Sequence, residues 1–317
     1  FYCKIYMTNK KIIVQVSEGL GNQLFMYAHS LSLSKKLNYD LEIDNISSYK
    51  RKKNLLRNHQ KYLLDYFSLN LPTVKDDFLV NGKLYNIKKK ILLFYDRFKI
   101  KKSFYIETKK NINSIKRFNN DDFFNTYTFS NKIYVLGNFE NPNYFKQYRK
   151  ELITNLTIKN EYLDFNIPYI NELKDSNSIS IHIRRNRFSD QNKINNKNLI
   201  NKSLNFTNDT IEYINNGINY FNKRIDNPKY FIWSNDMNNI HEFTDRLNIS
   251  NFKLIKNNDV INDFYLFKFS KHFIVGPSSF HWWGAWLNNN KNKICVRPSK
   301  INPSNNSGFW PEDWISI

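Results

Sequence analysis

The stretch KIIVQVSEGLGNQLFMYAHSLSLSKKL, residues 11–37, contains the pattern that decides the fold. Its first part, Lys11 to Val16, is short and rich in β-branched residues, which predicts a buried strand. Gly19-Leu20-Gly21 interrupts the strand. Apolar residues then recur near a 3.6-residue period from Asn22 to Leu37, which predicts a helix. A strand, a glycine turn and a helix together are the unit from which parallel α/β folds are built.

The same alternation continues along the chain. Further strands are expected at residues 41–43, 133–136, 178–183, 230–233, 252–255, 272–275 and 294–297. Helices are expected at residues 144–156, 209–224, 261–270 and 279–287. Residues 54–130 are aromatic and basic, and predict only partial helix. The alternation in both halves predicts two Rossmann-type α/β domains that face each other across a cleft, with ligands at the carboxyl ends of the strands.

Chain length and a shift in composition predict the domain boundary. The chain has 317 residues, more than one core usually fills. A polar stretch from Asp164 to Asp175, with Pro168 inside it, separates the two α/β patterns. We therefore expect an N-terminal domain of residues 1–165 and a C-terminal domain of residues 166–317.

Composition and charge limit the classes of function. Apolar residues make up 41% of the chain and aromatic residues 16%, enough for folded cores although the mean hydropathy is -0.63. The formal net charge of +20 favours a nucleic acid, an anionic membrane surface or a phosphorylated ligand. The basic clusters at residues 50–53, 88–90 and 99–102 are short and interrupted by apolar residues. They predict either solvated helix faces or a patch that lies against a membrane.

The cysteines and the hydropathy bear on location. Cys3 and Cys295 lie at opposite ends of the chain, too few for a disulfide framework or a zinc site, which agrees with a reducing compartment. No run of about 18 apolar residues predicts a transmembrane helix. We therefore expect a cytoplasmic protein, with peripheral contact at the inner membrane as an additional expectation.

Two motifs place glycines or arginines where a predicted strand ends. Gly19-Leu20-Gly21-Asn22 would let a ligand approach the backbone and a helix N-terminus that attracts anions, or would be only a tight turn. Arg184 and Arg185 follow His182 at the end of the SISIHI strand. A bound diphosphate would supply partners for their guanidinium groups, and an ion pair between domains is the alternative.

Two more motifs follow later strands. Trp233-Ser234-Asn235-Asp236 suits recognition of a base or ribose, and capping of a helix by Asn235 or Asp236 is the alternative. In residues 276–287, GPSSFHWWGAWL, the two serines can cap a helix and donate to phosphate. At least two of the three tryptophans in this motif are expected in the core.

Together these motifs resemble the bacterial α-1,2-fucosyltransferase family, glycosyltransferase family 11. The resemblance is carried by GLGNQLFMYA (19–28), VLGNFENPNYF (135–145), SIHIRR (180–185), FIWSND (231–236), HFIVGPSSFHWWGAWL (272–287) and FWPEDWI (309–315). They follow the family's order over nearly the whole chain. The resemblance implies a GT-B-like fold, GDP-L-fucose as donor, inversion at the anomeric carbon, and no required metal or other cofactor.

The resemblance also implies roles for individual residues. Gly21 and Asn22 would lie near the fucose and the acceptor. His182 and Arg184 would contact GDP, with Arg184 at the diphosphate and Arg185 in support. Asp236 would read the guanine. The phosphates and the fucose would be lined by Ser278, Ser279 and Phe280.

Two positions depart from the family's pattern. The usual HxRRGD is HIRRNR here, so an acidic residue is missing, and either Arg187 adds a positive charge or Asp190 substitutes for the acid. The first glycine of the usual GGLGNQ is Glu18 here, either a catalytic base or a surface residue. The predicted catalytic residues are therefore Arg184, Glu18 and Asp190.

These observations predict an inverting transferase that moves L-fucose from GDP-β-L-fucose to the 2-hydroxyl of a terminal galactoside. The acceptor would belong to a surface polysaccharide such as O-antigen, including a lipid-linked one, and arginine would replace a metal ion at the diphosphate. The net charge suggests a nucleic-acid-binding protein as an alternative, but no nucleic-acid motif is present and no such partner is expected. The missing Gly-Asp suggests a second alternative, a glycan- or nucleotide-binding protein without catalysis.

Overall fold

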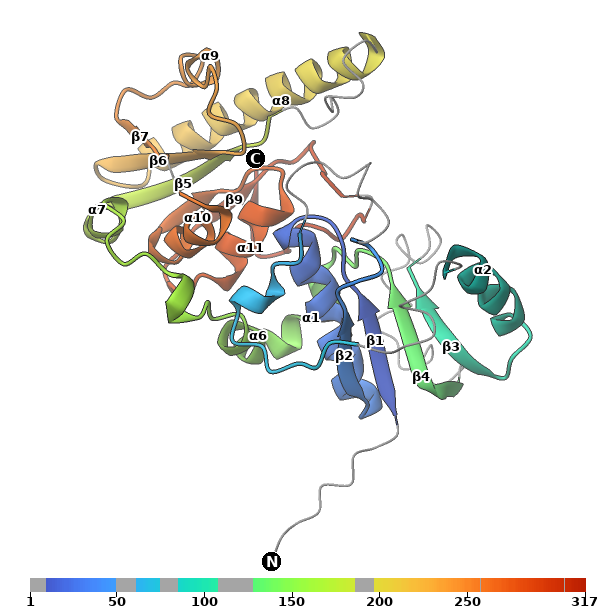
Figure 1. Cartoon of the computed structure of the whole chain (residues 1–317). Helices are drawn as coiled ribbons and strands as arrows, with labels where there is room; N and C mark the ends of the chain where they lie inside the picture. Colours follow the sequence, from blue (N-terminus) through green and yellow to red (C-terminus); the bar gives the residue numbers. More distant parts are fainter. Residues whose placement is uncertain are drawn as a thin grey trace, which may run out of the picture. The chain divides into compact units, whose positions relative to one another are not determined.

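The computed structural model describes residues 10–49, 61–74, 85–107, 128–185, 197–256, 258–304 and 306–317. The chain forms two compact units, each built on a parallel β-sheet with helices packed against it (Figure 1). The first unit runs to Thr157 and includes Ser304–Phe309. The second comprises Ile158–Pro303 and Trp310–Ile317. The prediction of two parallel α/β domains is therefore confirmed.

The division between the units differs from the predicted boundary in two respects. It lies between Thr157 and Ile158, before the predicted division at residues 165 and 166. Ser304–Phe309, which the sequence analysis assigned to the second domain, packs with the first. Asn141 Nδ2 donates to Asn306 Oδ1 at 3.2 Å, and the Phe309 ring lies 5.9 Å from the Phe25 ring. No periodic pattern reveals this return, because the described residues of the segment form no helix or strand.

The first unit is a four-stranded sheet with strand order β2-β1-β4-β3. Its strands are β1 (Lys11–Gln15), β2 (Asp40–Asp44), β3 (Lys101–Ile106) and β4 (Thr128–Leu136). Its helices are α1 (Leu20–Leu37), α2 (Tyr85–Asp96) and α6 (Arg149–Asn155), with 3-10 turns at Leu64–Tyr66, Pro142–Tyr144 and Lys146–Tyr148. The buried β1 lies between β2 and β4 and is therefore one of the two interior strands of this sheet.

One helix of the first unit is shorter than predicted, and one strand was missed. The expected helix over residues 144–156 is replaced by two 3-10 turns and the short α6. Phe145 lies between those turns with φ -143°, outside the helical region, and its buried ring packs 5.9 Å from Phe25. β3 is an edge strand that starts with two lysines and is mostly half-buried, so its sequence lacks a clear alternation.

The second unit is a six-stranded parallel sheet with strand order β10-β9-β8-β5-β6-β7. Its strands are β5 (Asn177–Ile183), β6 (Pro228–Ser234), β7 (Phe252–Leu254), β8 (His272–Ile274), β9 (Cys295–Arg297) and β10 (Ile315–Ser316). Its helices are α7 (Tyr169–Asp175), α8 (Lys197–Asn222), α9 (His241–Thr244), α10 (Val260–Leu266) and α11 (Ser279–Leu287), with 3-10 turns at Asn160–Tyr162 and Phe267–Phe269. α8 begins before the predicted residue 209, and the predicted helix over 261–270 ends as a 3-10 turn. None of the helices within the described ranges is long and apolar enough to cross a membrane.

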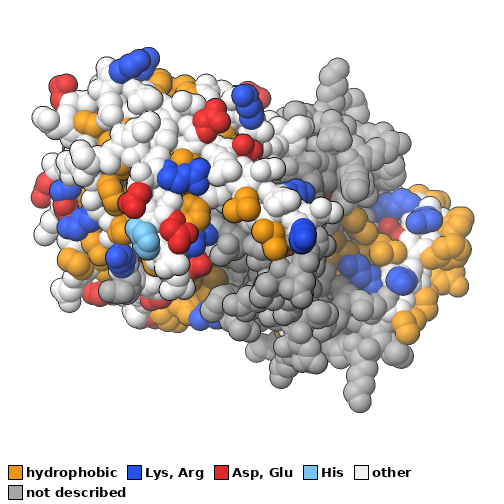
Figure 2. Space-filling view, turned by 90° about the horizontal axis from the view of Figure 1, so that it is seen from above, with side chains coloured by type: hydrophobic (Ala, Val, Ile, Leu, Met, Phe, Trp, Pro, Cys, Tyr) orange, Lys and Arg blue, Asp and Glu red, His pale blue; other side chains and the backbone are white. Residues whose placement is uncertain are grey.

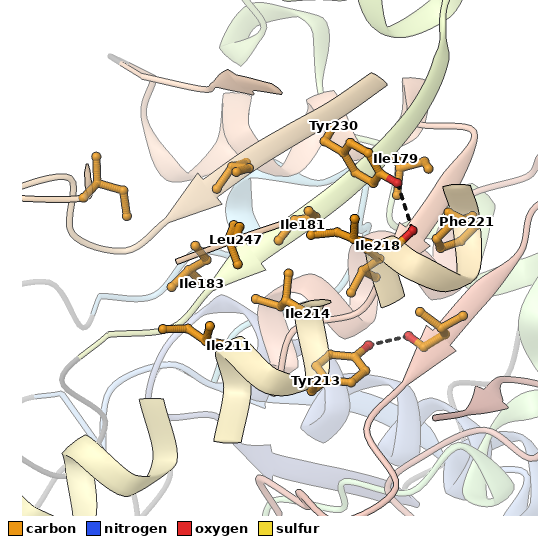
Figure 3. Packing of buried hydrophobic residues seen from close by; sticks show 14 residues of the cluster. Ile179, Ile181, Ile183, Ile211, Tyr213, Ile214, Ile218, Phe221, Tyr230 and Leu247 are labelled. Atoms are coloured by element: carbon orange, nitrogen blue, oxygen red, sulfur yellow. Dashed lines mark hydrogen bonds between the residues drawn. The ribbon is translucent and has the colours of Figure 1, made fainter. Parts of the chain in front are cut away.

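The sequence of β5 alternates between apolar and polar residues, which point to the two opposite faces of the sheet. Ile179, Ile181 and Ile183 point into an apolar cluster with Ile211, Ile214, Ile218 and Phe221 of α8 (Figure 3). The intervening serines and His182 are buried on the opposite face, where Ser180 contacts His281 of α11. A parallel strand covered on both faces is buried throughout, so its polar residues need internal partners.

Tyr213 of α8 ties the apolar cluster to two neighbouring strands. Its buried hydroxyl lies 3.0 Å from the Val275 carbonyl. It also lies 2.7 Å from the Val296 carbonyl (Figure 3). We predict that Tyr213→Phe lowers stability by about 1–2 kcal/mol, because both carbonyls lose this donor. Thermal unfolding measures the loss, with Tyr220→Phe on the same helix as control. Equal melting temperatures for the two variants would contradict the prediction.

Candidate functional site

The candidate site lies at the carboxyl edge of the second unit's sheet. β5 pairs in parallel with β6 on one side and with β8 on the other, so the residues that follow these three strands meet at one edge. The chain runs from β5 outward to β6 and β7 and later returns to β8 on the opposite side. β5 and β8 therefore form the topological switch point, where ligands of open α/β sheets bind.

The backbone at this switch point is packed too closely for a side chain at Gly276. A Cβ atom built on Gly276 would lie 2.1 Å from the carbonyl oxygen of His182. Glycine therefore lets the loop after β8 approach the end of β5. His182 itself is buried, and this burial, with the nearby Arg184 charge, lowers its pKa to about 3. The imidazole is therefore neutral at physiological pH.

His281 connects this loop to β5. The Gly276 backbone N–H donates to His281 Nδ1 at 3.0 Å, so the neutral ring carries its proton on Nε2. Nε2 then donates to Ser180 Oγ at 2.8 Å. Burial and the neighbouring His182 keep the pKa of His281 well below its usual value, which maintains the neutral form. His281 thereby fixes the loop in place.

The predicted capping role of the serine motif is confirmed. Ser278 is the N-cap of α11, and its Oγ accepts from the Phe280 backbone N–H at 3.3 Å. Ser279 is the first residue of α11, so both serines lie where the helix dipole favours an anion. All three tryptophans of the motif, Trp282, Trp283 and Trp286, are buried, as expected for core residues.

Arg184 and Arg185 follow the last residue of β5, and they have different surroundings. The Arg185 backbone N–H donates to Asn235 Oδ1 at 2.7 Å. Its guanidinium donates to the Asp236 carbonyl at 3.0 Å and to the Asn238 carbonyl, and lies 4.5 Å from the Phe243 ring centroid. Arg185 therefore holds the loop after β6, and these partners are all in its own unit. Arg184 is half-buried, and its charge acts on His182.

The capping alternative for Asn235 and Asp236 is wrong. α9 begins at His241, beyond both residues. They instead organise the loop after β6, in which Asp236 Oδ1 accepts from the Asn238 backbone N–H at 3.0 Å. Asp236 Oδ2 lies 3.8 Å from Arg185 Nη1. The Asp236 carboxylate is therefore oriented at the edge of the candidate site.

Asp263 is a carboxylate of this edge that the sequence analysis missed. It lies in the first turn of α10, which follows β7 and is capped by Asp259. Its pKa is raised to about 7, mainly by burial and in part by Asp259, although a 3.0 Å hydrogen bond from Asn258 Nδ2 opposes the shift. An acidic residue with a pKa near neutrality at a ligand-binding edge is a candidate functional group. Its sequence position within a plain helical pattern gave no signal of this burial.

The first unit presents a second carboxyl edge, at which Glu18 has a left-handed backbone. Its φ is 65°, whereas Gly19 is the N-cap of α1 with φ -81° and Gly21 lies inside the helix. The left-handed residue of this turn is therefore Glu18. Asn22 Nδ2 donates to Glu18 Oε2, and Gln23 Nε2 donates to the Glu18 carbonyl at 2.9 Å. These hydrogen bonds hold the residue in a conformation that is uncommon without glycine.

Glu107 organises the neighbouring loop of the first unit. Its Oε2 accepts from the backbone N–H groups of Asn138 and Phe139, both at 2.8 Å. Burial raises the pKa of Glu107. Phe139 also stacks on His29 with a 3.7 Å centroid distance. Glu107 therefore has a structural function in the VLGNFENPNYF motif, which the sequence analysis did not reveal.

The structure distributes the predicted site residues between the two units. Glu18, Gly21 and Asn22 lie in the first unit at the N-terminus of α1. The second unit brings together His182, Arg184, Arg185, Asp236, Ser278, Ser279 and Phe280 at one sheet edge. Asp190, with Arg187, lies outside the described residues. In the part of the chain that the structure describes, no group of three or more His, Cys, Asp or Glu side chains could hold a metal ion.

Comparisons of the sequence match one family along nearly the whole chain. The model described as glycosyl transferase family 11 matches residues 11–316. An Escherichia coli α-1,2-colitosyltransferase is 26% identical over 319 residues, covering 96% of this chain and 98% of the relative. The Escherichia coli O-antigen biosynthesis glycosyltransferase WbnK is 39% identical over 56 residues, 17% of this chain and 18% of that protein.

Comparisons of the structure match known fucosyltransferases. Fucosyltransferase NodZ from Bradyrhizobium matches with a TM-score of 0.50 and 12% identity, over 93% of this chain and 96% of that chain. An Arabidopsis thaliana FUT1 variant in complex with GDP matches with a TM-score of 0.50 and 10% identity, over 92% and 71%. At such identities these matches show the fold alone, and they confirm the GT-B-like α/β architecture.

The raised pKa of Asp263 predicts a pH-dependent stability. Its pKa of about 7 in the folded chain lies above the ordinary pKa of 3.8, so the folded chain binds this proton more tightly. The resulting stability is present at low pH and is lost as the pH rises through about 7. We therefore predict that the melting temperature of Asp263→Asn, relative to that of the wild type, increases as the pH rises from about 5 to about 8. The prediction would be ruled out if the melting temperatures of Asp263→Asn and the wild type differed by a constant amount over this pH range, as is expected for the exposed control Asp313→Asn.

Proposed function

Because the chain belongs to glycosyltransferase family 11, we propose that it transfers L-fucose from GDP-β-L-fucose to the 2-hydroxyl of a terminal galactoside. In this proposal the reaction inverts the anomeric carbon and requires no metal ion. The observation that carries it is Arg184, which follows β5 at the switch point of the second unit, where Gly276 and the N-terminus of α11 follow the paired strand β8. This arrangement suits a bound nucleoside diphosphate.

The proposed chemistry follows from where charge develops. The acceptor hydroxyl oxygen forms a bond to the anomeric carbon while the bond from that carbon to the GDP oxygen breaks. GDP leaves with the electron pair, and the transition state has oxocarbenium character, as in other glycosyl reactions. The growing negative charge on the diphosphate would be stabilised by the Arg184 guanidinium and by the N–H groups of α11.

The surroundings of Arg184 support its assignment to the diphosphate. His182 and His281 are neutral, so neither competes with Arg184 for an anion. Arg185 is bound to the loop after β6 and therefore supports the site as a positioning residue. A fixed guanidinium binds phosphate oxygens bidentately and keeps its charge at all physiological pH values.

Guanine recognition needs a carboxylate that accepts from the N–H groups of the base. We propose Asp236 for this role, because the carboxylate follows β6 and is oriented by Asn238 and Arg185. Asp263 is the second candidate at the same edge, and binding of guanine N–H groups would lower its raised pKa. Phe280, which is half-buried near Phe264 and Phe267, would line the sugar.

On the acceptor side, we propose that Glu18 is the general base that removes the proton from the attacking hydroxyl. A left-handed conformation costs an L-residue roughly 1–2 kcal/mol, which the surrounding structure must offset. Its hydrogen bond from Asn22 orients the carboxylate. An observed backbone outlier of this kind motivates a functional assignment. Asp190 stays a prediction as a further acidic residue.

Two relatives bear on the sugar and the product. The α-1,2-colitosyltransferase names a second candidate sugar, since colitose is fucose without its 3-hydroxyl. A site that hydrogen-bonds this hydroxyl would reject the deoxy sugar. Competition between the two GDP-sugars therefore separates the candidates. The name of WbnK, which matches over 56 residues, supports O-antigen as the glycan product.

The role of Arg184 predicts a large loss of turnover. We expect Arg184→Ala to lower turnover by about 10²–10³-fold, because a donor to the transition-state charge is lost. Product formation from GDP-fucose and a panel of galactosides measures this, with linkage analysis of the product. The exposed Arg224→Ala is the matched control. Near wild-type turnover of folded Arg184→Ala would defeat the assignment, and loss of activity in EDTA would defeat metal independence.

The role of Glu18 makes a separate prediction. We expect Glu18→Gln to lower the rate by about 10²–10⁴-fold, the usual contribution of a general base. Glu18→Gly relieves the left-handed strain, so this variant should be slower and also more stable than the wild type. The exposed Glu312→Gln is the control. A loss of less than about tenfold in Glu18→Gln would exclude Glu18 as the base.

A further inference from the structure

Helix α2 of the first unit exposes an apolar stripe to solvent. Ile87, Ile91, Phe94 and Phe98 follow at spacings of four, three and four residues, which places them on one side of the helix and its final turn. Their exposed fractions are 55%, 49%, 56% and 75%, and neighbouring Tyr95 is 58% exposed. The Phe94 ring lies 5.5 Å from Phe98 and 5.8 Å from Tyr95, so the aromatic surface is continuous. A surface helix usually turns its apolar side toward the core, whereas α2 turns this apolar stripe toward solvent.

Contacts on the opposite side of α2 fix this orientation. Asp96 is buried, and its carboxylate accepts from the Ser103 backbone N–H at 2.7 Å. Lys102 Nζ donates to the Asp96 carbonyl at 2.7 Å and to the Arg97 carbonyl at 3.2 Å. The helix is thus tied to the start of β3 by its polar side. The apolar stripe consequently faces outward.

Basic residues surround the stripe. Lys90, Arg97, Lys99 and Lys101 are all exposed. The segment 87–102 contains one acidic residue, and it is the buried Asp96. Figure 2 shows apolar side chains interleaved with Lys and Arg side chains on this part of the surface. Two of the basic clusters seen in the sequence are therefore the rim of an exposed apolar face.

We propose that α2 and residues 97–102, together called the basic apolar face, bind an anionic lipid membrane. An interfacial helix of this type buries its apolar side at the level of the lipid headgroups, while its basic residues attract the anionic lipid. Two copies of this chain would place like charges against each other. Nucleic acid would leave the exposed aromatic and aliphatic side chains unmatched. Charge complementarity therefore favours the lipid surface over both.

This inference goes beyond the proposed transfer reaction. The basic apolar face belongs to the first unit, which carries Glu18 and Asn22. It does not include any residue to which a role in donor binding or catalysis was assigned. Vesicle binding can therefore be measured without a sugar, and its failure leaves the proposed transfer reaction untouched.

Co-sedimentation with vesicles tests the basic apolar face. We expect the full chain to bind vesicles of equal parts phosphatidylcholine and phosphatidylglycerol, and to bind pure phosphatidylcholine at least tenfold more weakly, because each basic residue near an anionic surface strengthens binding about fivefold. Phe94→Ser/Phe98→Ser should lower binding to the mixed vesicles by about tenfold or more. Phe165→Ser/Leu204→Ser, which changes two side chains that are 59% and 56% exposed, should bind like the wild type.

A second pair of variants tests the charge. Lys90→Glu/Lys99→Glu should weaken binding to the mixed vesicles, whereas Lys291→Glu/Lys300→Glu, also at exposed positions, should weaken it much less. Melting temperatures confirm that each variant is folded. Equal binding of both aromatic pairs, or no binding of the wild type, would overturn the proposal. A wild-type dimer in light scattering that Phe94→Ser/Phe98→Ser dissociates, without vesicle binding, would instead assign this face to a second copy.

Discussion

The close approach of the Gly276 backbone to the His182 carbonyl is the constraint on which the candidate donor site depends. It brings the loop after β8 against the end of β5, so that α11 can begin at the switch point. His281 stabilises this arrangement by accepting from Gly276 and donating to Ser180. The burial of these groups also determines the charge of the site. Since both histidines are neutral, the positive charge comes from arginine.

The two arginines that follow β5 are adjacent in sequence but have different functions. The Arg185 side chain is nearly buried, and its guanidinium donates to the loop that carries Asp236. Its loss would displace that loop as well as remove a charge. Arg184, one residue earlier, is half-buried, and its charge helps to keep the neighbouring His182 imidazole neutral. The Arg185 guanidinium thus stabilises the loop after β6, and we assign the Arg184 guanidinium to the ligand.

Much of this architecture could be predicted from the sequence, because buried parallel strands leave a strong pattern. The runs that form β1, β5 and β6 are rich in apolar and β-branched residues, and the glycine and serine motifs follow them directly. β3 was missed because an edge strand that begins with lysines lacks this pattern. Asp263 was missed because its raised pKa arises mainly from burial, which its place in a plain helical pattern does not reveal. The left-handed conformation of Glu18 was not predicted, because side-chain hydrogen bonds that the sequence pattern does not reveal stabilise it.

The return of Ser304–Phe309 to the first unit has a consequence for biosynthesis. Phe25 near the N-terminus and Asn141 both receive packing partners from this late segment. During translation the second unit must emerge from the ribosome before those partners are available. The first unit therefore cannot complete its interior before residues 304–309 have been synthesised.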